Sequence, residues 1–199
     1  MTPRNEQENE KIKSERKEEI LEAALKLFAK NGFSATKISE IAAVAGLSHG
    51  LVYHYFDSKE DIFVQLLEES LTTSIGVFQM FAAGSNSPRE KLTDIIESII
   101  PLAYQGIGSY YFLIVLEAYK SESVPDKVKE LVAEMGPKYR EYLLPIIEEG
   151  QKKNQIIAGD PKEIVTSFLS LLHGLAVMTL QDDEVNIPEP EIILQMFLC

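Results

Sequence analysis

The stretch TKISEIAAVAGLSHGLVYHYFDSKEDI, residues 36–62, decides the fold class of this protein. It contains two short segments with apolar residues at helical spacing, one after Thr36 and one after Ser48, and the turn between them carries Gly46. Threonine and serine are favoured at helix starts because their side-chain oxygen accepts a hydrogen bond from a free backbone N–H. The stretch therefore predicts two short helices joined by a tight turn, which is the helix-turn-helix arrangement.

The second short helix, which we predict from Ser48 to Phe56, has two unlike faces. At about 100° per residue, Val52, Tyr55 and Phe56 share one arc, and we expect them in the core. The opposite arc and its borders carry His49, Gly50, Leu51, Tyr53 and His54. A solvated helix normally exposes Lys, Glu or Gln at such positions. Glycine allows a DNA backbone to approach closely, and the other four side chains can contact phosphates, base edges or a thymine methyl group.

Lys59 occupies an unusual place for a cation. It lies in the first turn of the helix that Ser58 and Asp61 begin, where the helix macrodipole disfavours positive charge. A phosphate bound at that N-terminus would pair with the lysine and with the free N–H groups. We therefore predict that Lys59 is a phosphate ligand.

The segment GFSATKISEIAAVAGLSHGLVYHYFDSKEDI, residues 32–62, together with the helix upstream, resembles the DNA-binding domain of the TetR family of bacterial repressors. The resemblance implies four phosphate-binding residues: Thr36, Ser48, Tyr53 and Lys59. It also implies that bases or neighbouring phosphates are contacted by His49, Gly50, Leu51 and His54. Lys37, where the family often has threonine or serine, is added to the DNA-binding residues. His49 stands where the family often has lysine or arginine, so the resemblance implies no particular operator sequence.

The rest of the chain also has helical spacing. It contains no alternating strand pattern and no repeat of about 20–50 residues. We predict an all-α fold of about nine helices, with an N-terminal three-helix DNA-binding domain at residues 1–57 and disordered residues 1–10. A helical ligand-binding and dimerisation domain is expected at residues 58–199, and helix 58–82 is expected to link the two.

Composition indicates a cytoplasmic globular protein. The chain has 199 residues, of which 45% are hydrophobic, enough for a substantial core. The single cysteine, Cys199, excludes an intramolecular disulfide and a cysteine-rich zinc site, which fits a reducing compartment. The first residues are charged, unlike a secretory signal, and no apolar run reaches the roughly eighteen residues of a membrane helix.

The acidic charge is unevenly distributed. The net charge is −12, which opposes phosphate binding, but residues 1–57 hold 8 Lys+Arg against 9 Asp+Glu. The remaining residues hold 11 against 22. The N-terminal segment is therefore close to neutral, which permits contact with DNA without forming a basic patch.

Residues after about position 85 carry no catalytic set. His173 is the only histidine there and has no evident nucleophile partner, so a core histidine is the simplest interpretation. No glycine-rich phosphate loop and no zinc-ligand spacing occurs. We expect no enzymatic activity, no metal and no cofactor.

Aromatic and methionine residues are frequent in the same region. Such residues usually form core, but ligand pockets also combine aromatic walls with a few polar groups. The resemblance implies an inducer pocket here, for which the candidates are Tyr104, Tyr111, Phe112, Glu117, Tyr139, Tyr142, His173 and Met178. Glu117 suits a cationic ligand, the alternative being a solvent-facing or internally paired carboxylate.

The helix expected at residues 160–180 is apolar on more than one face, so it must be covered on both sides. In the family the last two long helices form a four-helix dimer interface. Candidates for that interface or for the inducer pocket are Phe168, Leu171, Leu172 and Leu175, and further interface candidates are Ile192 and Met196. A two-fold dimer also places two recognition helices in successive major grooves, about 34–36 Å apart.

The resemblance implies a repressor that binds a palindromic operator in double-stranded DNA as a homodimer. A small apolar or amphipathic inducer is expected to release it from DNA. The alternative is a DNA-binding protein of the same fold that a protein partner regulates.

Overall fold

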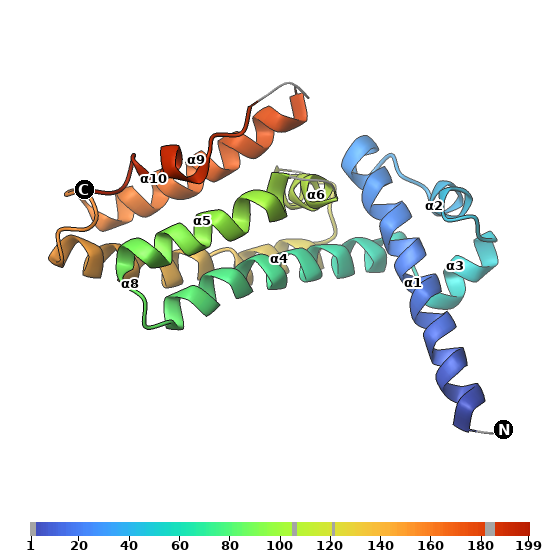
Figure 1. The fold of residues 1–199 in the computed structure, drawn as a ribbon. Coiled ribbons are helices and arrows are strands. Elements are labelled where there is room, and N and C mark those ends of the chain that lie inside the picture. The colour runs from blue at the N-terminus through green and yellow to red at the C-terminus, as the bar shows by residue number, and fades with distance from the viewer. Residues whose placement is uncertain (1–2, 105–106, 121, 182–185) are drawn as a thin grey trace. The chain divides into compact units, whose positions relative to one another are not determined.

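A computed structural model describes residues 3–104, 107–120, 122–181 and 186–199. Within these ranges the chain forms ten helical segments and no strand beyond one isolated bridge, which confirms the predicted all-α class (Figure 1). The segments are α1 (Pro3–Asn31), α2 (Ile38–Val44), α3 (His49–Tyr55), α4 (Lys59–Ala83), α5 (Pro88–Tyr104), α6 (Gly108–Lys120), α7 (Asp126–Met135), α8 (Lys138–Lys152), α9 (Pro161–Gln181) and α10 (Pro190–Leu194).

Local hydrogen bonds explain where several helices begin. Ser87 and Glu90 form a reciprocal capping box at the start of α5: the Ser87 N–H donates to the Glu90 carboxylate at 2.8 Å, and the Glu90 N–H donates to the Ser87 hydroxyl at 3.4 Å. Hydrogen bonding from Ser87, through its side chain first and its backbone N–H second, lowers the pKa of the Glu90 carboxyl. Ser58 caps α4 through its side chain, since its hydroxyl accepts the Asp61 N–H at 3.1 Å and donates to the Asp61 carboxylate at 2.8 Å.

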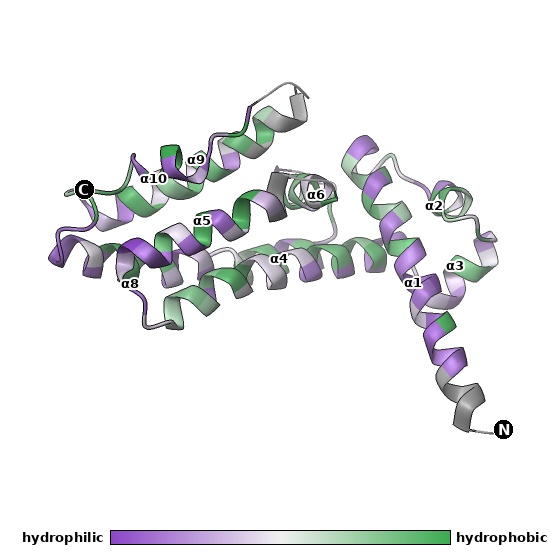
Figure 2. Ribbon diagram, in the orientation of Figure 1, coloured by the Kyte–Doolittle hydropathy of each residue, from purple (hydrophilic) through white to green (hydrophobic). Residues whose placement is uncertain are grey.

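The first helix is longer than the sequence suggested. Residues 3–10 were predicted to be disordered, but α1 begins at Pro3. Just after these residues, Lys11 and Glu15 lie one helical turn apart, with the ammonium and carboxylate at 3.7 Å, a pairing that favours helix. Figure 2 shows that the described N-terminal part of α1 is mostly hydrophilic and that its apolar residues gather toward the C-terminal end, where the buried residues begin at Ile20.

The chain divides into two compact packing units, and the division differs from the one predicted at residue 57. Unit 1 comprises residues 1–69 and 113–130, and unit 2 comprises residues 70–112 and 131–199. Helices α4, α6 and α7 therefore each contribute residues to both units. The helix predicted at residues 58–82 matches α4 closely. The first part of α4 belongs to unit 1 and the rest belongs to unit 2.

Unit 1 is built on a cluster of three buried phenylalanines. Phe28 of α1, Phe33 of the following turn and Phe63 of α4 have ring centroids 5.0–5.9 Å apart. Edge-to-face pairs of this kind add to the stabilisation from buried area. Helix α1 packs on α2, and α2 packs on α3, so the cluster supports the helix-turn-helix.

Unit 2 has a larger aliphatic core formed mainly by α5, α8 and α9. The last residues of the chain close it: the Ile157 N–H donates to the Phe197 carbonyl at 3.0 Å, and the Phe197 ring lies edge-on to Phe168 at 5.3 Å. None of the described helices combines the length and the hydropathy that a bilayer crossing requires.

Three residues predicted at a dimer interface belong to this core instead. Phe168, Leu172 and Leu175 are buried within unit 2, with Phe168 only 1% exposed. The error arose because α9 is apolar on several faces and helical spacing does not tell which face a chain keeps for itself. Ile192 and Met196 are exposed, and Leu171 is partly buried.

We expect Gly150→Ala to lower the free energy of unfolding by about 1–3 kcal/mol, because it overfills a packed site. A Cβ at Gly150 would overlap the Ile156 side chain and come within 3.1 Å of the Pro88 Cβ. Gly76→Ala in α4 is the matched control, since its Cβ meets nothing within 4 Å and a gain of about 0.5–1 kcal/mol is expected. Urea denaturation of both variants checks this, and equal effects would contradict it.

Candidate DNA-binding site

The helix-turn-helix at residues 38–55 has the predicted geometry. Gly46 ends α2 with a φ of +68°, a conformation that favours glycine, and the Leu47 N–H then donates to the Ala42 carbonyl at 2.9 Å. Ser48 caps α3, as predicted, by accepting the Leu51 N–H at 3.2 Å. The two short helices are thus joined by a turn that hydrogen bonds hold in one form.

Helix α3 has the two faces that its sequence predicts. Val52 and Phe56 are buried, and Tyr55 is half-buried. The opposite face holds exposed His49, Gly50, Tyr53 and His54, with Leu51 half-buried at its border. Tyr53 is 47% exposed and lies edge-on to His49 at 5.0 Å. The structure therefore brings the predicted DNA-contacting residues of α3 onto one accessible surface.

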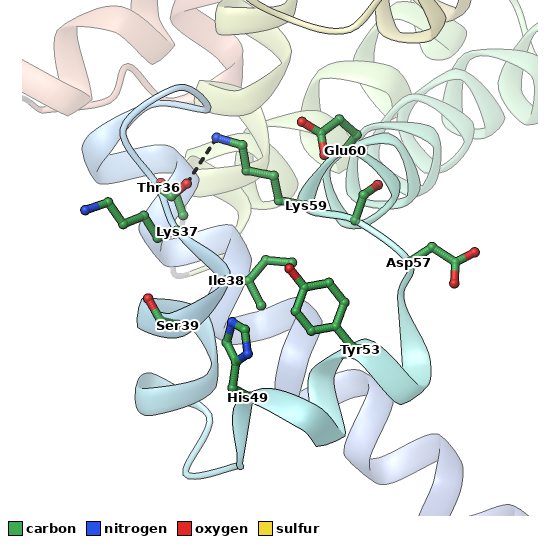
Figure 3. Close-up of a pocket in the computed structure, with 10 residues that line it drawn as sticks. Thr36, Lys37, Ile38, Ser39, His49, Tyr53, Asp57, Lys59 and Glu60 are labelled. Atoms are coloured by element: carbon green, nitrogen blue, oxygen red, sulfur yellow. Dashed lines mark hydrogen bonds between the residues drawn. The ribbon is translucent and has the colours of Figure 1, made fainter.

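A shallow open hollow of about 370 Å³ lies beside this surface (Figure 3). Its lining combines the N-terminal ends of α2 and α4 with the exposed face of α3: Thr36, Lys37, Ile38, Ser39, His49, Tyr53, Asp57, Ser58, Lys59 and Glu60. The lining thus includes five of the nine predicted DNA-binding residues, and two more, Ser48 and Gly50, adjoin His49 in the sequence. Two helix N-termini that open onto the same depression favour an anionic group.

Thr36 needs a correction. It was predicted to begin α2 and bind phosphate, but Lys37 is the N-cap residue, and Thr36 is 1% exposed. The Thr36 hydroxyl donates toward the carbonyls of Gly32 at 2.8 Å and Leu27 at 3.3 Å. Its side chain therefore fastens the turn to the end of α1, which sequence spacing does not reveal.

Lys59 is engaged by the protein itself. Its ammonium donates to the backbone carbonyls of Phe33 at 2.9 Å, Thr36 at 3.1 Å and Ser34 at 3.3 Å, and Figure 3 shows the bond to Thr36. The ammonium also lies 4.5 Å from the centroid of the Phe33 ring. A lysine has three N–H donors, and all three have carbonyl acceptors here. The unusual cation at this N-terminus is thus explained by the α1–α2 turn.

Lys37 is the exposed cation of this surface. Its backbone N–H donates to the Glu40 carboxylate at 2.9 Å, which fixes the start of α2, and its side chain reaches solvent. Asp57 and Glu60 line the same hollow, so the local charge is mixed. Besides Lys37, this surface offers helix N-termini, hydroxyl groups and imidazole groups.

Most of the predicted ligand residues lie in unit 2. Phe112, Tyr139 and Tyr142 pack against its core, and the Tyr139 hydroxyl shares a hydrogen bond of 2.6 Å with Ser74. Phe112 and His173 have ring centroids 5.7 Å apart, and burial lowers the pKa of His173 even though part of its side chain is exposed. Tyr111 is half-buried and Met178 is exposed, while the Tyr104 side chain lies outside the described residues.

Glu117 differs from this group. It belongs to unit 1, where its Oε1 accepts the Phe33 N–H at 2.8 Å. The internally paired alternative is therefore the one that the structure shows. Of the turn at residues 32–36, the sequence placed only Thr36 in the site, although the unexplained lysine in the first turn of α4 was a signal for the rest of the turn.

We expect Thr36→Val to lower the free energy of unfolding by about 1–2 kcal/mol, because the Gly32 carbonyl loses its donor inside the protein. Thr36→Ser keeps the hydroxyl and should lose less. Urea denaturation at 25 °C, followed by far-ultraviolet circular dichroism, measures both. Normal stability of Thr36→Val together with weaker DNA binding would instead support the phosphate contact that the sequence suggested.

Known proteins share this fold and this motif. The family model for bacterial regulatory proteins of the tetR family matches residues 20–66. The HTH-type transcriptional repressor KstR2 of Rhodococcus jostii (strain RHA1) is 29% identical over 165 residues, which cover 79% of this chain and 76% of that protein. The TetR family transcriptional regulator PfmR from Thermus thermophilus has a TM-score of 0.74 at 22% identity, with 89% of this chain and 93% of that chain covered.

A further solved structure is that of AibR in complex with isovaleryl coenzyme A and operator DNA. It has a TM-score of 0.72 at 20% identity and covers 91% of this chain and 95% of its own. The residues matched by the family model run from the buried part of α1 into α4 and include the whole helix-turn-helix. Residues 20–66 thus match the tetR family of bacterial regulatory proteins, and the relatives and solved structures support a TetR-family helix-turn-helix regulator.

Proposed function

We propose that this protein is a repressor that binds a palindromic operator as a homodimer and leaves it when a small apolar or amphipathic ligand binds unit 2. The single observation that carries the DNA half is the exposed face of α3, where tyrosine, histidine and glycine stand in place of ordinary solvating residues. One of the relatives, KstR2, is an HTH-type transcriptional repressor, which supports repression.

Each residue of the interface has a role that follows from its chemistry. Tyr53 and His54 donate hydrogen bonds to phosphates or base edges, while Gly50 admits the DNA backbone. Ser48 accepts the Leu51 N–H and keeps its own O–H free to donate to a phosphate. Lys37 supplies a positive charge that attracts phosphates. Lys59 holds the α1–α2 turn and does not bind phosphate in this proposal. The N-terminus of α4 therefore offers a phosphate only its backbone N–H groups.

The homodimer is supported by the exposed side of α9. From Ile164 to Gln181 this helix contains no charged residue. Three of its exposed residues, Ser170, Gly174 and Met178, are spaced four apart and form one stripe. An uncharged stripe with small residues suits close packing against a second copy, and Leu171 at its border extends the contact.

The ligand proposal rests on the aromatic residues of unit 2 and on the family. Phe112, Tyr139 and Tyr142 are partly buried against the core of unit 2, and the two tyrosines add hydroxyl groups. The lowered pKa of His173 keeps its imidazole neutral at pH 7. Neutral polar groups among aromatic rings suit an apolar or amphipathic molecule. The structure of AibR was solved with isovaleryl coenzyme A, which supports a ligand of this general kind.

We expect Tyr53→Phe to weaken specific DNA binding about 5-fold, because one hydrogen bond to the DNA is lost. Tyr55→Phe is the matched control, since Tyr55 lies on the core side of α3 and should leave affinity unchanged. The probe is a fluorescein-labelled duplex selected with the wild-type protein from a random-sequence library, and fluorescence anisotropy measures the dissociation constants.

The dependence of affinity on salt concentration tests the claim that this protein binds DNA. Phosphate contacts release counterions, so the affinity must fall as salt rises. A flat salt dependence would refute DNA binding through this surface. Equal affinities of the Tyr53 and Tyr55 variants would refute the assignment of the α3 face.

We expect Ser170→Glu to weaken dimerisation by more than about 100-fold, because it places two like charges at the two-fold interface. Ser85→Glu, in the exposed loop between α4 and α5, adds the same charge away from α9 and serves as control. Analytical ultracentrifugation over a concentration series measures the equilibrium. A Ser170→Glu dimer as stable as the control would contradict an interface on this side of α9.

A further inference from the structure

We propose that Glu117 is a positioning residue for DNA binding: its carboxylate holds the turn at residues 32–36 and thereby sets the place of α2 and Lys37. This inference rests on the proposed DNA-binding function and assigns a role to a residue with no place on the DNA-facing surface. Glu117 is separated from the turn by 84 positions in sequence.

The carboxylate lies directly against the backbone of the turn. Glu117 Oε1 accepts the Phe33 N–H at 2.8 Å, and it is 3.0 Å from the position that a Cβ would take on Gly32. Gly32 has a φ of +79°, which favours glycine, and the missing side chain leaves the room that the carboxylate occupies. A hydrogen bond from a backbone amide to an ionised carboxylate is stronger than one to a neutral acceptor.

Phe33 is consequently held on both of its main-chain polar groups. Its N–H binds Glu117 of α6, and its carbonyl binds the ammonium of Lys59 of α4 at 2.9 Å. Its ring is buried against Phe28 and Phe63. Opposite charges from two helices therefore fix one residue of the turn.

The restraint passes along a short path to the DNA-facing surface. Lys59 also binds the carbonyl of Thr36, and the next residue, Lys37, is the N-cap of α2. Lys37, Ile38 and Ser39 line the hollow beside Tyr53. When Glu117 is removed, the Phe33 N–H loses its acceptor, the turn gains freedom, and DNA binding must order it again. Part of the binding free energy is then spent on that ordering.

The test compares Glu117→Ala and Glu117→Gln with Glu130→Ala, an exposed glutamate of the same unit. With the selected duplex as probe, Glu117→Ala should weaken binding about 10-fold. Glu117→Gln should fall between Glu117→Ala and the wild type, since an amide oxygen still accepts the N–H but carries no charge. Glu130→Ala should bind as the wild type does. All affinities are measured at a temperature where circular dichroism shows each variant fully folded.

Nuclear magnetic resonance supplies a readout that a loss of stability alone would not move. In Glu117→Ala the Phe33 amide proton should shift upfield and exchange faster with solvent, and the Lys37 amide should shift as well, while the Glu130→Ala spectrum keeps these signals. If Glu117→Ala does not fold, the same two measurements on Glu117→Gln decide the matter.

Two outcomes separate the inference from the proposed function. Wild-type affinity and an unchanged Phe33 signal in the Glu117 variants, with weaker binding in Tyr53→Phe, would overturn the positioning role and leave the DNA interface standing. Unchanged affinity in Tyr53→Phe as well would overturn the interface assigned to α3.

Discussion

The ammonium of Lys59 is the contact on which the DNA-facing surface depends. Three carbonyls of the turn between α1 and α2 accept its hydrogen bonds, and two of these bonds, to Phe33 and Thr36, are partly shielded from solvent. The Lys59 side chain satisfies all three at once, and the Phe33 ring beneath it anchors the same turn in the phenylalanine cluster. Helix α2 begins directly after this turn, so its position follows from how the turn is held.

This use of Lys59 changes the electrostatics expected for DNA binding. With its ammonium committed to carbonyls, the surface retains Lys37 as an exposed cation and otherwise relies on neutral donors and helix N-termini. Residues 58–199 carry 22 acidic against 11 basic side chains. This excess of acidic residues repels phosphates, which fits the DNA contacts that we propose for the near-neutral segment.

Helix α9 shows how one element can serve two surfaces. Its buried face, with Phe168, Leu172 and Leu175, completes the core of unit 2, while its other face carries an uncharged stripe through Ser170 and Gly174. Small residues at the stripe leave room for a second helix without disturbing the core behind them. The two roles need different faces of the helix and therefore do not compete for the same residues.

The sequence alone determined the all-α class, the helix-turn-helix and the two faces of α3. These features depend on local signals: the serine caps, Gly46 in its left-handed turn, and the spacing that buries Val52 and Phe56 while exposing Tyr53. These signals act through hydrogen bonds within one or two helical turns. They can therefore be predicted from residues that are neighbours in the sequence.

Tertiary structure alone decided which partners the polar and apolar side chains take. Thr36 binds carbonyls of α1 and the turn after it, Lys59 binds the turn at residues 33–36, and Glu117 binds the Phe33 N–H from 84 positions away. The spacing of apolar residues likewise did not show which face of α9 packs in the core, since several of its faces are apolar. A side chain's chemistry states what kind of partner it needs, but only the fold brings a particular partner within hydrogen-bonding distance.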